Sequence, residues 1–182
     1  MSTLRLLAPA LAAAGLVAAC TTQPIATRSP AGPDLGRSLS PNDVEAIDFS
    51  IPPSGAGLPP GSGNVRQGEA VYAAKCQSCH GAKGAGKPAD PLVGGNGSLA
   101  SDNPVRTVGS YWPYATTLFD YIRRAMPTTA PRSLSNDEVY AVSAYLLNLN
   151  GIVAADAVMS AQTLPQVRMP NRDGFVDHSG KR

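Results

Sequence analysis

Aromatic residues, cysteines and histidines are all scarce in this sequence. Aromatics make up 5% of the 182 residues, and there are three cysteines and two histidines, against 18 glycines and 17 prolines. This composition predicts long loops and a small hydrophobic core, which is marginally stable alone. The length fits one domain with extensions. With so few histidines and thiols, and no cluster of carboxylates, the sequence offers no evident pair of catalytic groups.

Charge of neither sign dominates. The net charge is +2, but residues 75–132 carry seven basic and three acidic side chains, an excess of four positive charges. This excess either steers an acidic partner protein or forms an ordinary solvated surface. The basic residues are sparse and lack the interleaved aromatic residues typical of nucleic-acid-binding surfaces, so we expect no nucleic-acid partner.

Two of the three cysteines lie in the run Cys76-Gln77-Ser78-Cys79-His80, the attachment signature of a c-type haem. Each thiol can form a thioether bond with one vinyl group of the haem, and the histidine then lies beneath the iron as an axial ligand. A redox dithiol, a disulfide and half a zinc site also use Cys-x-x-Cys. A zinc site needs further ligands, and only Cys20 and His178 remain. The motif therefore predicts one covalent haem c, which adds apolar volume to the small core.

The third cysteine follows an N-terminal segment typical of export. Residues 1–19 carry Arg5 and then an apolar run that is short for a membrane span, ending in Val17-Ala18-Ala19-Cys20. This end resembles the lipobox of bacterial lipoproteins, which implies cleavage before Cys20 and lipidation of that residue. The alternatives are a simple secretory peptide and an uncleaved anchor. We expect a protein on the periplasmic side of a bacterial membrane, anchored through the lipid or otherwise soluble.

Capping signals predict the helices. Ser40 and Pro41 open a short helix, and Asn64 caps a longer one that leads to Cys76. A third helix carries Leu118, Phe119 and Ile122 at 3.6-residue spacing and ends at Arg123 and Arg124.

The last core helix has the clearest signals. Ser135 and Glu138 form a capping box, Leu134 and Val139 a hydrophobic staple, and Asn150-Gly151 a stop. The tail that follows is polar and has no core of its own, and we expect His178 near its end to be solvated. The predicted organisation is a signal peptide (1–19), a flexible tether (20–33), an N-terminal wrap (34–63), a haem domain (64–151) and a C-terminal tail (152–182).

These elements resemble the class I cytochromes c, an all-α family in which small helices surround one covalent haem. The resemblance rests on the haem motif and on Gly68 and Tyr72, which match positions where the first helix crosses the last one closely, so that Tyr145 would meet both. It implies that a proline carbonyl orients the histidine. Pro91 is the candidate, with Pro88 as the alternative.

The same resemblance implies a second axial ligand, from a Met-Pro pair after the third helix. Met126-Pro127 fits this position. Met169 is also followed by a proline but lies beyond the last helix, so the tail would have to fold back over the haem. Trp112 either forms a hydrogen bond with a haem propionate or packs in the core, and Tyr111 has the same alternatives.

A narrower resemblance covers residues 34–176. Asp34-Leu35-Gly36-Arg37, residues 57–63, residues 109–122 and residues 168–175 are similar to the cytochrome c subunits of bacterial sulfite and sulfane dehydrogenases. The family implies electron transfer from a molybdenum sulfur-oxidising subunit to a downstream cytochrome or a terminal oxidase. Some members carry two haems, whereas this chain has one haem motif. The wrap and the tail then either dock the partner or only cover the domain.

We therefore expect an electron-transfer protein rather than an enzyme. With both axial positions filled by protein, the iron has no open place for a substrate or gas. The alternatives are a membrane-tethered electron shuttle to an oxidase that needs no sulfur enzyme, and a haem enzyme or gas sensor in which Met126 dissociates.

Overall fold

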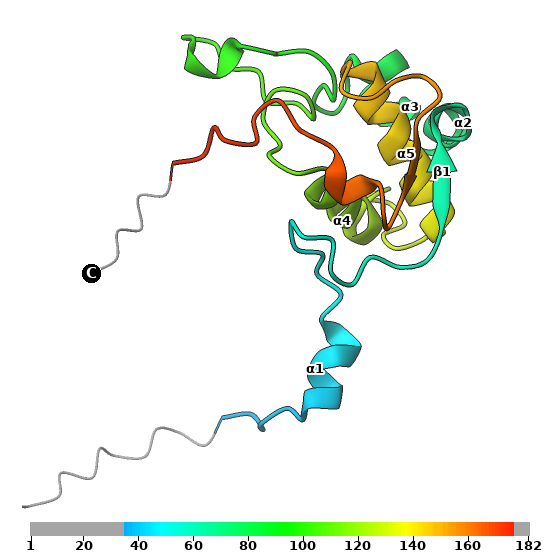
Figure 1. Cartoon of the computed structure of the whole chain (residues 1–182), viewed down its shortest axis with the longest axis vertical. Coiled ribbons are helices and arrows are strands. Elements are labelled where there is room, and N and C mark those ends of the chain that lie inside the picture. Colours follow the sequence, from blue (N-terminus) through cyan, green and yellow to red (C-terminus); the bar gives the residue numbers. More distant parts are fainter. Residues whose placement is uncertain (1–34, 177–182) are drawn as a thin grey trace, which may run out of the picture. The chain divides into compact units, whose positions relative to one another are not determined.

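The computed structural model describes residues 35–176 (Figure 1). The chain divides into two units, Met1–Leu39 and Ser40–Arg182, and the first is described only over residues 35–39. The elements of the second unit are, in chain order, α1 (Pro41–Ile47), β1 (Ser62–Asn64), α2 (Val65–Lys75), α3 (Gln77–His80), η1 (Ala82–Gly84), η2 (Ser98–Ala100), α4 (Ala115–Ala125), α5 (Asn136–Leu149), β2 (Val158–Ser160) and η3 (Leu164–Gln166). The predicted all-α fold is confirmed, with one small two-stranded sheet added to it.

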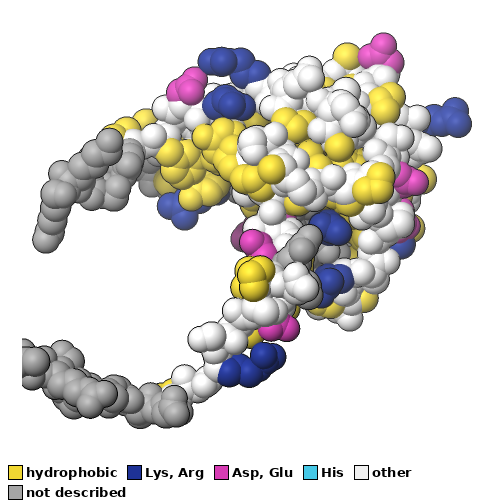
Figure 2. Space-filling view, turned by 60° about the horizontal axis from the view of Figure 1, so that its bottom comes forward, with side chains coloured by type: hydrophobic (Ala, Val, Ile, Leu, Met, Phe, Trp, Pro, Cys, Tyr) yellow, Lys and Arg dark blue, Asp and Glu magenta, His cyan; other side chains and the backbone are white. Residues whose placement is uncertain are grey.

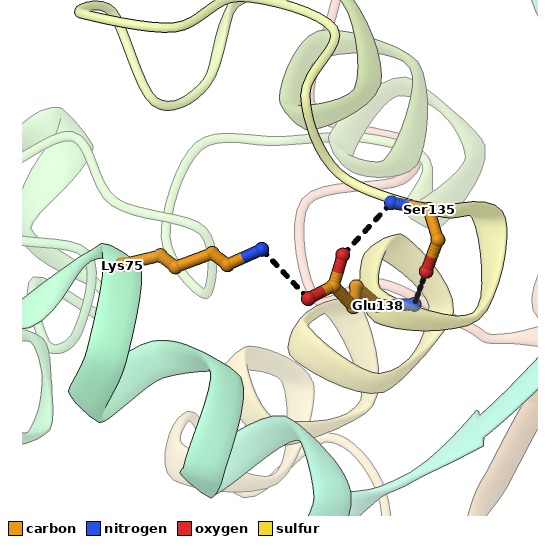
Figure 3. A network of polar contacts seen from close by, with 3 residues as sticks. All are labelled: Lys75, Ser135 and Glu138. Carbon is orange, nitrogen blue, oxygen red and sulfur yellow. Dashed lines mark hydrogen bonds and ion pairs between the residues drawn. The ribbon is translucent and has the colours of Figure 1, made fainter.

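Helix α5 is the centre of the fold and packs on both α2 and α4 (Figure 1). Its ends are as predicted. The Ser135 hydroxyl accepts the Glu138 N–H, the Glu138 carboxylate accepts the Ser135 N–H, and Asn150 ends the helix. Glu138 also accepts a hydrogen bond from the Lys75 ammonium of α2 at 2.7 Å, so one carboxylate caps α5 and joins it to α2 (Figure 3). These bonds, first of all that from Lys75, lower the pKa of Glu138 below its ordinary value.

Helices α2 and α5 cross closely because Gly68 has no side chain. A Cβ at Gly68 would lie 1.9 Å from the carbonyl oxygen of Ala141 and 2.7 Å from the Cβ of Tyr145, both on α5. One turn later, the Tyr72 and Tyr145 rings meet with their centroids 5.4 Å apart. The predicted contact of Gly68 and Tyr72 with Tyr145 is therefore confirmed, and it fixes the end of α2 from which the haem motif continues.

Helix α4 packs its apolar side on α5, as its spacing predicts. Leu118, Phe119 and Ile122 are buried, and the Phe119 ring lies 4.4 Å from that of Tyr140 on α5. The helix ends at Ala125, and Met126 follows in extended backbone. The chain therefore changes direction at Met126.

The tail after α5 contributes more to the core than its polar composition predicts. It has no core of its own, but Met159, Leu164, Val167 and Met169 are buried in the main core. Strand β2 pairs with β1 in an antiparallel ladder that aligns Met159 with Gly63. A Cβ at Gly63 would lie 2.3 Å from the Ala141 nitrogen, so glycine lets this strand lie directly on α5. Residues 62–63 and 158–169 therefore extend the packed domain beyond the 64–151 core.

The wrap before β1 is largely irregular, as its prolines and glycines predict. Ile51 is buried, and the Tyr140 hydroxyl donates a 2.8 Å hydrogen bond to the Pro59 carbonyl, so both residues help to fasten the wrap to the core. At its start, the Ser40 side chain caps α1 and Pro41 is the first helical residue, as predicted. Val44 and Ile47 on that helix are exposed.

Candidate functional site

One large cavity lies between α2, α4, α5 and the loops that join them. Its volume is about 650 Å³, within the range usual for cofactor sites. The haem-motif residues lie on one part of its wall and Met126 on another. Apolar side chains form much of the rest: Leu92, Val108, Trp112, Leu118, Ile122, Val142 and Leu146. The cavity thus brings together six of the predicted site residues, Cys76, Cys79, His80, Pro91, Trp112 and Met126.

Both cysteines of the motif lie on this cavity. Cys76 ends α2 and begins α3, so the short helix α3 holds Cys79 and His80 one turn further on. Cys76 is half-buried and Cys79 exposed, and neither forms a disulfide. Burial raises the pKa of the Cys76 thiol to about 11, so the free thiol is protonated at neutral pH. Among residues 35–176, no group of three His, Cys, Asp or Glu side chains could hold a metal ion, so the described part of the chain offers no zinc site.

A backbone carbonyl orients the His80 ring, but it is not the predicted one. The His80 Nδ1 lies 3.0 Å from the carbonyl oxygen of Asp90, the residue before Pro91. A residue that precedes a proline is restricted to extended backbone, which fixes the direction of its carbonyl. Pro91 itself lines the cavity, and so does Pro88. Because a carbonyl only accepts hydrogen bonds, Nδ1 carries the proton and Nε2 keeps a lone pair for a metal.

The loop after the histidine is closed by hydrogen bonds. The His80 carbonyl accepts the Gly86 N–H at 2.8 Å, and the Cys79 carbonyl accepts the Ala89 N–H at 2.8 Å. From α2, the Tyr72 hydroxyl donates to the Gly81 carbonyl at 2.8 Å. Burial raises the pKa of Tyr72 to about 12, so it remains a donor throughout the neutral range. Together, these hydrogen bonds fix the position of the haem motif relative to the Asp90 carbonyl.

The two Met-Pro pairs lie in different surroundings. Met126 is half-buried on the cavity wall, at the point where α4 ends. Met169 is only 1% exposed and belongs to the core, as does Met159. Neither of these two lines the cavity. Met1, like Cys20 and His178, lies outside the described residues. Of the methionines in residues 35–176, only Met126 therefore offers its sulfur to this cavity.

Aromatic residues border the cavity at the start of α4 and along that helix. Trp112 lines the cavity and its ring contacts that of Tyr121 edge-on at 5.5 Å. Tyr111 points elsewhere, because it contacts the Phe175 ring at 5.4 Å and the Arg106 guanidinium at 5.5 Å. Packing is thus the observed role of Tyr111, and Trp112 is placed for contact with a bound group.

The face in Figure 2 shows basic side chains in several separate places, some of them next to one another, and hydrophobic side chains gathered in one area. Of the seven basic residues in 75–132, Lys75 and Arg106 line the cavity, together with the acidic Asp90. The positive charge of this region is therefore spread over the surface, with two cations at the cavity itself.

The donor set fits haem c. Two free thiols, an imidazole with an available Nε2 and a thioether surround a cavity with a mainly apolar wall, which suits covalent attachment and two axial ligands. Sequence reasoning did not identify the Asp90 carbonyl as the acceptor for His80, although its place before a proline was a usable signal. It also did not identify the Tyr72 hydroxyl as a donor to the loop or Arg106 as a cavity residue, because no local sequence pattern predicts either.

Comparisons with known proteins agree with this geometry. The family model described as cytochrome C oxidase, cbb3-type, subunit III matches residues 63–146. In the crystal structure of the sulfane dehydrogenase SoxCD from Paracoccus pantotrophus, a chain is 44% identical, with a TM-score of 0.71, over 79% of this chain and 71% of that chain. The chain belongs to the cytochromes c. A search of curated proteins found no match.

As a cytochrome c, the protein is an electron carrier with covalently bound haem c, and it is related to a chain of the sulfane dehydrogenase SoxCD. The aligned part, 79% of this chain, is longer than residues 63–146, so it includes part of the wrap or the tail. Among the described residues, no helix has the length and apolar character that crossing a membrane requires.

Proposed function

We propose that this cytochrome accepts single electrons from a molybdenum-dependent sulfite or sulfane dehydrogenase and passes them to a downstream cytochrome or a terminal oxidase. The observation that carries the proposal is the 44% identity with a chain of the SoxCD structure over 79% of this chain. A resemblance limited to the haem motif and its helices would support any electron carrier, but the flanks are similar as well.

The residues on the cavity support a definite ligand assignment. In this proposal, Cys76 and Cys79 would attach the haem covalently through their thiols, and His80 and Met126 would hold its iron. The Asp90 carbonyl oxygen lies 3.0 Å from the His80 Nδ1 and holds the ring in the tautomer that leaves Nε2 free. Pro91 contributes to the cavity wall next to that carbonyl, and Trp112 is the candidate for a propionate contact.

The bound haem supplies reversible one-electron exchange at its iron, and a thioether ligand favours the ferrous state. The protein's part is to hold the ligands, exclude water and leave an edge of the group accessible. Helix α3 fixes the positions of the two thiols, and the hydrogen bonds accepted by the Gly81, His80 and Cys79 carbonyls fix the loop. Helix α4 ends at the residue directly before Met126.

We also propose that the protein is periplasmic and held at a membrane by lipid on Cys20, with residues 1–19 as its signal peptide and 20–33 as a tether. The sequence motif at residues 17–20 supports this. Mass spectrometry of the mature protein tests it, because a lipidated N-terminal Cys20 has a characteristic added mass. A mature chain without lipid contradicts the anchor and leaves the rest of the function unaffected.

The function is tested by anaerobic mixing of the oxidised protein with sulfite, with and without a molybdenum sulfite-oxidising enzyme, while haem absorbance is followed. We expect fast reduction only when the enzyme is present. Equal rates with and without enzyme, in a protein with an intact haem spectrum, contradict the proposed donor.

A second candidate is a tethered electron shuttle to an oxidase that needs no sulfur enzyme. The match of residues 63–146 to the oxidase subunit family favours it. In that case a terminal oxidase oxidises the reduced protein rapidly, while sulfite and its enzyme fail to reduce it.

A further inference from the structure

A second, smaller pocket lies behind the segment that carries Met126. Its volume is about 210 Å³, and its lining residues are Phe49, Arg123, Arg132, Leu134 and Asn136. Arg123 belongs to the last turn of α4, and Arg132 lies in the loop that leads from Met126 to α5. The two arginines thus stand on either side of Met126 in the chain and converge on one pocket.

Within residues 35–176, neither of these arginines has a carboxylate partner. Their neighbour Arg124 does, because it pairs with Asp120 one turn earlier. The acidic residues next to the lining residues in sequence are engaged elsewhere: Asp48 accepts the Ser50 N–H, and Asp137 accepts the Ser62 N–H at 2.8 Å. The pocket therefore has two positive charges and no negative side chain on its wall.

The wall of the pocket is held in place from several elements. The Arg132 guanidinium lies 4.5 Å from the centre of the Phe49 ring, and the Arg124 guanidinium lies 5.7 Å from the same ring. Asn136 donates its side-chain N–H to the Pro60 carbonyl at 3.2 Å. A guanidinium fixed by such contacts loses little freedom when it binds a ligand.

We propose that this pocket binds a small oxyanion group between Arg123 and Arg132. Guanidinium forks match the oxygen spacing of sulfate, phosphate and carboxylate groups, and the bonds are charge-assisted. The group comes either from a free ion or from a carboxylate side chain of a partner. No residue of the haem site takes part in binding it.

The bound group links α4 to the loop after Met126. Ile122, next to Arg123, and residues 127–129 line the haem cavity, so the segment from Ile122 to Arg132 contributes to the walls of both pockets. An anion that bridges Arg123 and Arg132 restrains both ends of this segment. It therefore stabilises the fold and opposes the departure of the methionine from the haem side.

Thermal unfolding of the haem-loaded protein tests the proposal, with sodium sulfate titrated against sodium chloride at equal ionic strength. Binding predicts a midpoint that rises steeply at low sulfate and then only with the logarithm of the sulfate concentration. Sulfate also stabilises proteins generally, by exclusion from their surface, and that effect lacks the steep rise at low concentration. The variants Arg123→Gln and Arg132→Gln should each lose the steep rise at low sulfate.

The matched control is Arg168→Gln, which removes the same charge from an exposed arginine paired with Asp173. It should keep the steep rise at low sulfate. A second titration with sodium acetate separates the sources: a steep rise at low acetate as well as at low sulfate indicates a partner's carboxylate, and a steep rise with sulfate alone indicates a free tetrahedral ion. If neither salt gives a steep rise at low concentration, or if the Arg123 and Arg132 variants respond like the native chain, the pocket is not an oxyanion site.

Discussion

Two regions of the molecule contain the same pair of residues, Met126-Pro127 and Met169-Pro170, in opposite surroundings. Met126 ends α4 on the wall of the large cavity, whereas Met169 is 1% exposed in the core next to the tail's other buried side chains. The dipeptide is identical, so the difference comes from where the preceding element ends and what the chain then packs against. A Met-Pro motif thus indicates a ligand only when a helix ends at the methionine beside the cavity.

The largest expected effect is that of Met126→Ala. Loss of the thioether opens one axial position, and the reduction potential falls by on the order of 0.1 V, part of the about 0.8 V span that axial ligation controls. Redox titration followed by haem absorbance measures it. An unchanged potential would mean that another group is the second ligand.

The counterpart Met169→Ala should affect stability and leave the haem unchanged. Removing a buried methionine side chain costs about 2–5 kcal/mol in the free energy of unfolding. Denaturant unfolding gives the cost, and the potential and visible spectrum of the same sample serve as controls. A variant that loses the thioether ligand while Met126 is present would reverse the assignment of the two methionines.

Tyr72→Phe tests the bond that joins the core to the haem loop. Losing the hydrogen bond to the Gly81 carbonyl should cost about 0.5–1.5 kcal/mol, with haem attachment retained. The pKa of Tyr72 is raised in the folded state from 10.0 to about 12, so its contribution is present below pH 10 and is lost as the pH rises through about 12. Unfolding measured on both sides of pH 10 should show a smaller alkaline loss of stability in the variant. Equal losses would mean that burial does not raise the pKa of Tyr72, and equal stability at neutral pH would mean that the bond does not stabilise the loop.

Glu138→Gln lies in neither region and should have the smallest effect. A glutamine retains part of the capping box but loses the charge that pairs with Lys75, so the cost is about 0.5–1 kcal/mol at neutral pH. Because folding lowers the pKa of Glu138, its stabilisation is present above the ordinary glutamate pKa and disappears as the pH falls through the lowered value. Variant and native chain should therefore converge in acid. A difference that persists there would point to packing instead of charge.

Local chemistry explains why much of the fold could be predicted. The caps at Ser40, Asn64 and Ser135 and the missing side chain of Gly68 act within a few residues or through one close contact, and the structure agrees with all four. The burial of Met159 and Met169 could not be predicted, since it depends on the tail crossing α5 through a three-residue ladder. A strand this short, with polar residues on both sides, shows no hydrophobic periodicity from which such a contact could be predicted.

The candidate site divides in the same way. The haem motif was predicted from its spacing, and Met126 from the resemblance to the class I cytochromes c. The Asp90 carbonyl was missed by one residue because the resemblance placed the acceptor on a proline, and the convergence of Arg123 and Arg132 depends on the path of a loop. Sequence reasoning therefore reached side chains that the structure brings to the cavity and missed groups that hold them in place.

The central claim is that both axial positions of the haem are occupied by the protein, by His80 and Met126, so that the molecule only carries electrons. The most direct test is the addition of carbon monoxide to the ferrous native protein, followed by absorbance, with Met126→Ala as the control. The account predicts no binding to the native protein without denaturant and rapid binding to the variant. Rapid binding to the native protein would contradict it and would favour a haem enzyme or a gas sensor.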